Sequence, residues 1–124
     1  MSGPVTIWHN PACGTSRKTL AMIREAGVEP EVIEYVVAGW DADELEALLA
    51  EAGLTPRDAL REPEARDRGL LEPGVTPEAI LDAMIAEPVL VQRPLVRTPR
   101  GVVLARPAEA VLPLLEPAAT SAAK

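Results

Sequence analysis

The sequence predicts an α/β fold built on a mixed four-stranded sheet, and two patterns carry this prediction. Near the N-terminus, β-forming runs at residues 4–8 and 31–37 flank a segment with helical spacing, 15–26; strand–helix–strand units of this kind pair their strands in parallel. Near the C-terminus, β-forming runs at residues 95–97 and 102–105 are separated by a four-residue turn, which is typical of an antiparallel hairpin. Helical segments should be inserted between the two halves of the sheet.

Length and composition favour a single domain over residues 1–124 and exclude several functional classes. Apolar residues make up 48% of the chain and Phe is absent, so the core should be aliphatic. The net charge of −7 and an aromatic content of 2% argue against nucleic acid or an anionic membrane as a partner. One cysteine permits no internal disulfide, and no secretory or membrane-spanning segment is seen, so we expect a cytoplasmic protein.

Capping residues mark the helix starts in the middle of the chain. Asp41 precedes an amphipathic run that ends before Gly53. Thr55 and Thr76 each stand before a proline, which is the arrangement of an N-cap followed by proline at the first helical position. These two helices should run to about residues 60 and 86.

The remaining segments are expected to be less regular. Residues 61–74 are charged and rich in turn formers, which predicts a surface loop. The segment after Pro107 has helical spacing, but Pro113 inside it predicts an early end or a kink. Residues 117–124 are rich in Ala and Ser and should form a frayed tail.

The only cysteine, Cys13, lies between the first predicted strand and the first predicted helix. With Thr15 or Ser16 as the N-cap, the thiol meets the partial positive charge and the unpaired backbone donors of a helix N-terminus. Such donors stabilise a thiolate and can hold an oxyanion. We therefore interpret Cys13 as a nucleophile rather than a small buried side chain. His9 and Asn10 are supporting candidates, although each could also be an ordinary strand-end or turn residue.

A family resemblance enters with these residues. The run from Ile7 to Leu20, Ile-Trp-His-Asn-Pro-Ala-Cys-Gly-Thr-Ser-Arg-Lys-Thr-Leu, resembles the active-site segment of the glutaredoxin-coupled arsenate reductases, the ArsC family. Gln92-Arg93-Pro94-Leu95-Val96 and Ala105-Arg106-Pro107-Ala108-Glu109 resemble its two Arg-Pro signatures, and residues 59–62 resemble the segment that carries a third arginine. The resemblance covers nearly the whole chain and implies a thioredoxin-like core with added helices.

By this resemblance, Cys13 attacks arsenate, a tetrahedral dianion that suits the planar donors of arginine. The implied substrate-binding residues are Arg61, Arg93, Arg106, Gly14, Thr15 and Ser16. Arg57, Arg66 and Arg68 compete with Arg61 for the third arginine position. The supporting residues are His9, Asn10 and Pro94, and a cis peptide at Pro94 would aim Arg93 toward the thiol. Arg17, Arg24, Arg97 and Arg100 are interpreted as solvated surface residues.

The cysteine count also bears on the reductant. A single thiol cannot close an internal disulfide, so a second sulfur must come from outside, and we expect glutathione as co-substrate and glutaredoxin as partner. No metal-ligand spacing or nucleotide-binding motif is present, so neither a metal nor a bound cofactor is expected.

Two alternatives to arsenate reduction remain open. One is a binding regulator similar to the Spx-type proteins, which dock on RNA polymerase and often carry Cys-x-x-Cys, whereas Ser16 stands three residues after Cys13 here. The other is a thiol oxidoreductase of the same fold that acts on another substrate.

Overall fold

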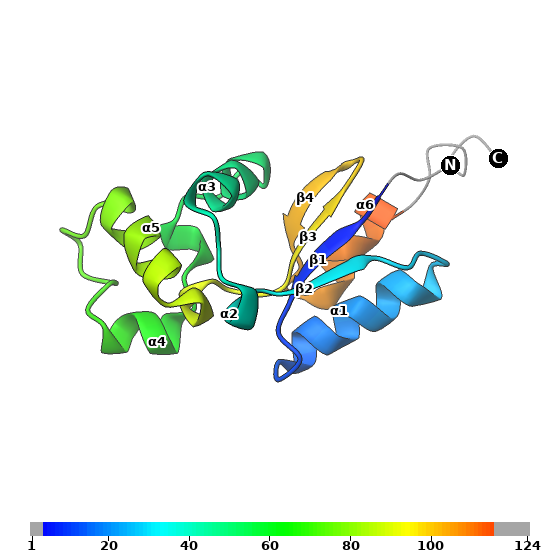
Figure 1. The fold of residues 1–124 in the computed structure, drawn as a ribbon, viewed down its shortest axis with the longest axis horizontal. Coiled ribbons are helices and arrows are strands. Elements are labelled where there is room, and N and C mark those ends of the chain that lie inside the picture. Colours follow the sequence, from blue (N-terminus) through cyan, green and yellow to red (C-terminus); the bar gives the residue numbers. More distant parts are fainter. Residues whose placement is uncertain (1–3, 116–124) are drawn as a thin grey trace. The chain divides into compact units, whose positions relative to one another are not determined.

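The expected mixed four-stranded sheet is present in the computed structural model, which describes residues 4–115 (Figure 1). Its strand order is β2-β1-β3-β4. The β1–β2 pair is parallel, whereas the β1–β3 and β3–β4 pairs are antiparallel. The strands are β1 (Thr6–His9), β2 (Glu31–Glu34), β3 (Leu95–Thr98) and β4 (Gly101–Leu104). The predicted tail at 117–124 lies outside the described residues.

Short helices make up most of the remaining described chain. Among residues 4–115, none of them is long and apolar enough to cross a membrane. The α-helices are α1 (Gly14–Glu25), α2 (Tyr35–Ala38), α3 (Ala42–Glu51), α4 (Glu62–Asp67), α5 (Pro77–Ala86) and α6 (Leu112–Leu115), and the 3-10 helices are η1 (Arg57–Ala59), η2 (Pro88–Leu90) and η3 (Ala108–Val111).

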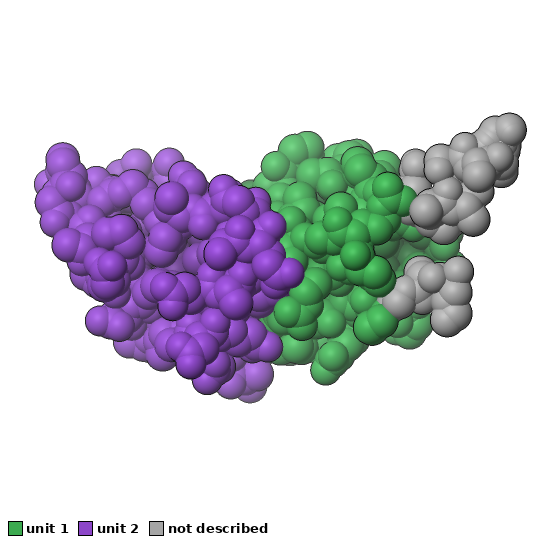
Figure 2. All heavy atoms as spheres, turned by 90° about the horizontal axis from the view of Figure 1, so that it is seen from above, with its two compact units in different colours: residues 1–34, 93–124 green, residues 35–92 purple. Residues whose placement is uncertain are grey.

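The chain divides into two compact units, coloured separately in Figure 2. Of the described residues, 4–34 and 93–115 form the first, which contains the sheet, α1, η3 and α6. Residues 35–92 form the second, which is helical and is inserted in sequence between β2 and β3. This second unit is the inserted helical segment that the sequence predicts.

An aliphatic core joins α1 and the C-terminal helices to one face of the sheet. Ile7 and Val96 are register partners on β1 and β3, so their side chains share a face. Ile23 of α1 is fully buried in the same cluster, together with Val111 of η3. This packing holds α1 against the sheet, and it therefore fixes the loop that joins β1 to α1.

The second strand is shorter than predicted. We expected it to run to residue 37, but it ends at Glu34, and Tyr35 begins α2. The Tyr35 hydroxyl donates a 2.6 Å hydrogen bond to the Val91 carbonyl, and its ring packs 5.3 Å from that of Trp40. This hydrogen bond and this ring contact outweigh the β propensity of residues 35–37.

Two predictions in the helical insertion are also corrected. Residues 61–74 contain helix α4 rather than only a surface loop, because Pro63 occupies its first turn and Ala65 is buried. The rest of that segment is held by Arg57, whose guanidinium donates to the carbonyls of Leu71, Glu72 and Val75. The helix expected after Thr55 is the short 3-10 turn η1.

The caps at Asp41 and Thr76 are confirmed, and the second allows a clean stability test. The Thr76 hydroxyl accepts a 3.1 Å hydrogen bond from the Ala79 amide at the start of α5. Thr76→Ala should lower the free energy of unfolding by about 1 kcal/mol, whereas Thr76→Ser, which keeps the acceptor, should stay close to wild type. Urea unfolding followed by circular dichroism measures both, and equal losses would contradict the capping role.

Candidate active site

Cys13 itself is the N-cap of α1, which corrects the prediction that Thr15 or Ser16 caps this helix. Its backbone is extended, its amide donates to the Asn10 carbonyl at 2.9 Å, and its carbonyl accepts the first helical hydrogen bond from the Arg17 amide at 3.0 Å. The thiol, which is half-buried, therefore stands directly at the helix N-terminus. Free backbone donors of the first turn can reach it there.

Ser16 does not cap the helix because its hydroxyl is used elsewhere. It is fully buried, its Oγ lies 2.7 Å from His9 Nδ1, and it accepts the Asn10 amide hydrogen at 3.1 Å. The Asn10 side chain closes the turn by accepting the Ala12 amide hydrogen at 2.9 Å. His9, which ends β1 rather than beginning the loop, is thereby tied to the first turn of α1.

Burial is the main influence on the pKa of His9. It lowers the pKa of the imidazole below its ordinary value, the carboxylate of Glu34 opposes this, and the charges of Arg24 and Arg17 add to it. His9 is therefore neutral near pH 7. Its role in this geometry is to brace Ser16 rather than to supply a positive charge.

Two arginines from the C-terminal part of the chain meet the thiol. Arg93 is buried, and its guanidinium lies within hydrogen-bonding reach of Cys13. Arg106 Nη1 lies 3.9 Å from Cys13 Sγ and also donates a 2.9 Å hydrogen bond to the Arg93 carbonyl. The peptide bond between Arg93 and Pro94 is cis, as predicted, and the bond between Arg106 and Pro107, for which no prediction was made, is also cis.

The surroundings of Cys13 favour its thiolate. Burial alone would raise the pKa of the thiol, but hydrogen bonds from the Ser16 amide, Arg93, Arg106 and the Thr15 amide outweigh it, so the pKa is lowered. The same donors converge on the space beside the sulfur. This arrangement can therefore hold a tetrahedral oxyanion next to a nucleophilic sulfur.

Comparison with known proteins places this chain in a family. The sequence model of the ArsC family matches residues 8–114. The chain belongs to the ArsC family. A protein of Rhizobium meliloti named arsenate reductase is 53% identical, covering 90% of this chain and 81% of its own length. The arsenate reductase of Escherichia coli K12 is 46% identical over the same share of this chain and 80% of its own.

The solved structures agree with this assignment. The arsenate reductase from Vibrio cholerae superposes with a TM-score of 0.85 at 32% identity, covering 92% of this chain and 99% of that one. This ArsC family chain therefore has the thioredoxin-like fold, with its mixed four-stranded sheet and flanking helices.

Arg61, the third arginine implied by the family resemblance, lies in the helical insertion. It is the N-cap of α4, and its Nη1 donates to both carboxylate oxygens of Glu64 at 2.7 and 2.6 Å. Its amide donates to the Leu90 carbonyl at 2.8 Å. Within its own unit, the Arg61 charge is thus already matched by a carboxylate, whereas Arg93 and Arg106 gather at the thiol.

The remaining expected site residues are placed by the first turn of α1. Gly14 opens the helix; a methyl group on it would make an ordinary 3.7 Å contact with Arg17 Nη2, so space alone does not require glycine. The Thr15 main-chain amide donates a hydrogen bond to the Cys13 sulfur, and the Thr15 carbonyl accepts one from the Thr19 hydroxyl at 2.8 Å. Among residues 4–115, no group of three His, Cys, Asp or Glu side chains could hold a metal ion.

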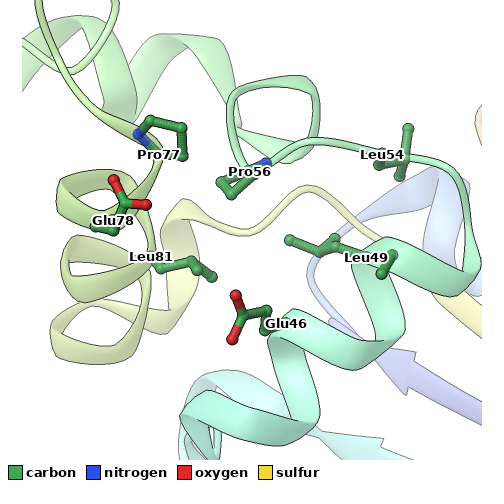
Figure 3. Close-up of a pocket in the computed structure, with 8 residues that line it drawn as sticks. Glu46, Leu49, Leu54, Pro56, Pro77, Glu78 and Leu81 are labelled. Atoms are coloured by element: carbon green, nitrogen blue, oxygen red, sulfur yellow. The ribbon is translucent and has the colours of Figure 1, made fainter.

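A separate hollow of about 210 Å³ lies in the helical insertion (Figure 3). Leu49 and Leu81 line it together with Pro56, and two carboxylates, Glu46 and Glu78, stand at its sides. These side chains supply no thiol and no hydrogen-bond donor for an oxyanion. The described donors that could hold an oxyanion therefore lie at the Cys13 loop and not at this hollow.

Because the donors around Cys13 favour its anion, alkylation by iodoacetamide should show a midpoint below the ordinary thiol value of about 8.5. Sulfate bound beside the sulfur should raise that midpoint, since a second negative charge disfavours the thiolate. The measurement is the alkylation rate against pH, with and without sulfate. A midpoint at or above the ordinary value in both conditions would refute the interpretation that the surrounding donors lower the pKa of Cys13.

Proposed function

We propose that this protein is an arsenate reductase that depends on glutathione and glutaredoxin. The observation that carries the proposal is the convergence of Arg93, Arg106 and the first-turn amides on the Cys13 thiol. Membership in the ArsC family and the relatives named arsenate reductase support the same activity.

In the first step, the Cys13 thiolate attacks arsenic and forms a sulfur–arsenic bond, while one arsenic–oxygen bond breaks and its hydroxyl takes up a proton from solvent and leaves as water. Arsenate carries negative charge on its oxygens, and planar guanidinium groups bind such oxygens through paired hydrogen bonds. Arg93 and Arg106 are the residues for this role, with the amides of Thr15 and Ser16 completing the oxyanion site. Arg61 is kept as the third candidate ligand.

The second step needs an external thiol. Reduction of arsenate to arsenite takes two electrons, which are released when two thiols become one disulfide. Cys13 is the only cysteine of the sequence, so glutathione supplies the second sulfur. The glutathione thiolate attacks the Cys13 sulfur, the sulfur–arsenic bond breaks with its electron pair left on arsenic, and arsenite leaves. Glutaredoxin then frees Cys13 from the mixed disulfide with glutathione by thiol exchange.

Phosphate has nearly the same shape and charge as arsenate, so binding alone discriminates weakly between them. The sulfur–arsenic bond is the step at which the two anions differ. The arginines therefore concentrate and orient the oxyanion, and the thiolate selects it.

Lysine substitutions test the arginine roles, because Arg93→Lys or Arg106→Lys keeps the charge but removes the planar pair of donors. We expect kcat/KM for arsenate to fall at least about tenfold in either variant, since a charged hydrogen bond contributes about 1.5 to 3 kcal/mol. Arg100→Lys, in the turn between β3 and β4, is the matched control and should stay near wild type. Near-normal kcat/KM in both site variants would reduce their role to long-range attraction.

The proposed cycle is tested by turnover of the purified protein with arsenate, glutathione and glutaredoxin. Arsenite should accumulate, and intact mass under non-reducing conditions should show a glutathione-bearing species that is absent in Cys13→Ser. Thioredoxin as the only thiol source should not sustain turnover. Sustained arsenite production under that last condition would overturn the glutathione requirement.

A further inference from the structure

The guanidinium of Arg17 is held over the loop that carries the nucleophile. Arg17 lies one helical turn after Cys13, and helical side chains lean toward the helix N-terminus. Its Nη1 donates a 2.8 Å hydrogen bond to the Pro11 carbonyl, and its Nη2 lies beside Gly14. The side chain is exposed, so its remaining N–H donors face solvent at the loop.

Arg17 also differs from the other basic residues of α1 in its ion pairing. Lys18 forms an ion pair with Glu109 at 2.8 Å, and Arg24 forms one with Glu29 at 3.0 Å. Among residues 4–115, Arg17 has no carboxylate partner at ion-pair distance; a neutral main-chain carbonyl orients it instead. Among the basic residues of α1, Arg17 is thus oriented by a hydrogen bond but not paired with a carboxylate. Its guanidinium is bonded to the loop that precedes Cys13.

The distribution of charged residues along the sequence also bears on the role of Arg17. Residues 35–92 hold thirteen of the nineteen acidic residues but only four of the twelve basic ones, so the unit with Cys13 carries the excess of positive charge. Arg93 and Arg106 are occupied at the thiol itself. Arg17 is instead bonded to Pro11, two residues before Cys13, and its side chain is exposed.

We propose that Arg17 binds a carboxylate of the external thiol co-substrate and thereby selects carboxylate-bearing thiols over neutral ones. The proposal rests on the proposed function for its co-substrate, glutathione, which has a carboxylate at each end and a thiol between them. A guanidinium with one nitrogen anchored at Pro11 keeps its other donors for such a group. Arg17 is therefore a specificity-determining residue rather than an ordinary surface residue.

The test uses thiol–disulfide exchange, which needs no arsenate. The Cys13 thiolate attacks one sulfur of a disulfide, the disulfide bond breaks, a mixed disulfide forms on Cys13, and a thiolate leaves with the electron pair. The two probes are oxidised glutathione, which carries carboxylates, and 2-hydroxyethyl disulfide, which is neutral. The measured quantity is the ratio of their second-order rate constants, followed by intact mass.

Arg17→Gln should lower this ratio about two- to fivefold, the range expected for an exposed ion pair. Any change in the nucleophilicity of Cys13 affects both probes and cancels in the ratio. Arg24→Gln is the matched control, because it removes the same charge from the same helix at a site paired with Glu29, and it should leave the ratio unchanged. Arg17→Lys should recover part of the selectivity.

An unchanged ratio in Arg17→Gln, or an equal fall in Arg24→Gln, would overturn the proposal in favour of general attraction by charge. A loop distorted by loss of the Pro11 contact would slow both probes alike and would count against it as well. Because no arsenate takes part, a lowered ratio in a protein that does not reduce arsenate would retain Arg17 as a selector of anionic thiols while the proposed function fails.

Discussion

The placement of Cys13 as the N-cap of α1 is the constraint on which the site depends. Its amide is held by the Asn10 carbonyl and its carbonyl accepts from the Arg17 amide, so the residue is fixed on both sides by backbone hydrogen bonds. The sulfur then stands where helix amides are free to donate. A serine or threonine cap would fill that space with its own oxygen; here the reactive sulfur occupies it.

Buried polar contacts hold this loop to the sheet. His9 at the end of β1 and Ser16 in the first turn of α1 bond to each other, and the Asn10 amide bonds to the same hydroxyl. Polar groups in a buried setting must be paired, so each of these residues limits where the others can lie. The aliphatic core around Ile7 and Ile23 supplies the rigid support beneath them.

Charge is distributed unevenly between the two units of this acidic protein. The helical insertion carries most of the carboxylates, whereas the unit with the thiol has more basic than acidic residues. Within that unit, Arg93 and Arg106 contact the Cys13 sulfur, and Arg17 is bonded to the Pro11 carbonyl of the same loop. An oxyanion and an anionic thiol can therefore both be attracted to Cys13, although the net charge of the chain is −7.

Local sequence determined much of this protein. Several features depend on the preferences of neighbouring residues, which the sequence shows directly. They are the strand–helix–strand spacing, the hairpin around Pro99 and Arg100, the caps at Asp41 and Thr76, and the position of the cysteine between a strand and a helix. Tertiary structure decided the rest. Tyr35 entered a helix because its hydroxyl reaches Val91, and Cys13 replaced Ser16 as the cap because His9 binds the Ser16 hydroxyl. Arg17 and Arg24 look alike in sequence, but only packing and hydrogen bonding reveal that Arg24 is paired with a carboxylate whereas Arg17 is bonded to the Pro11 carbonyl of the loop before Cys13.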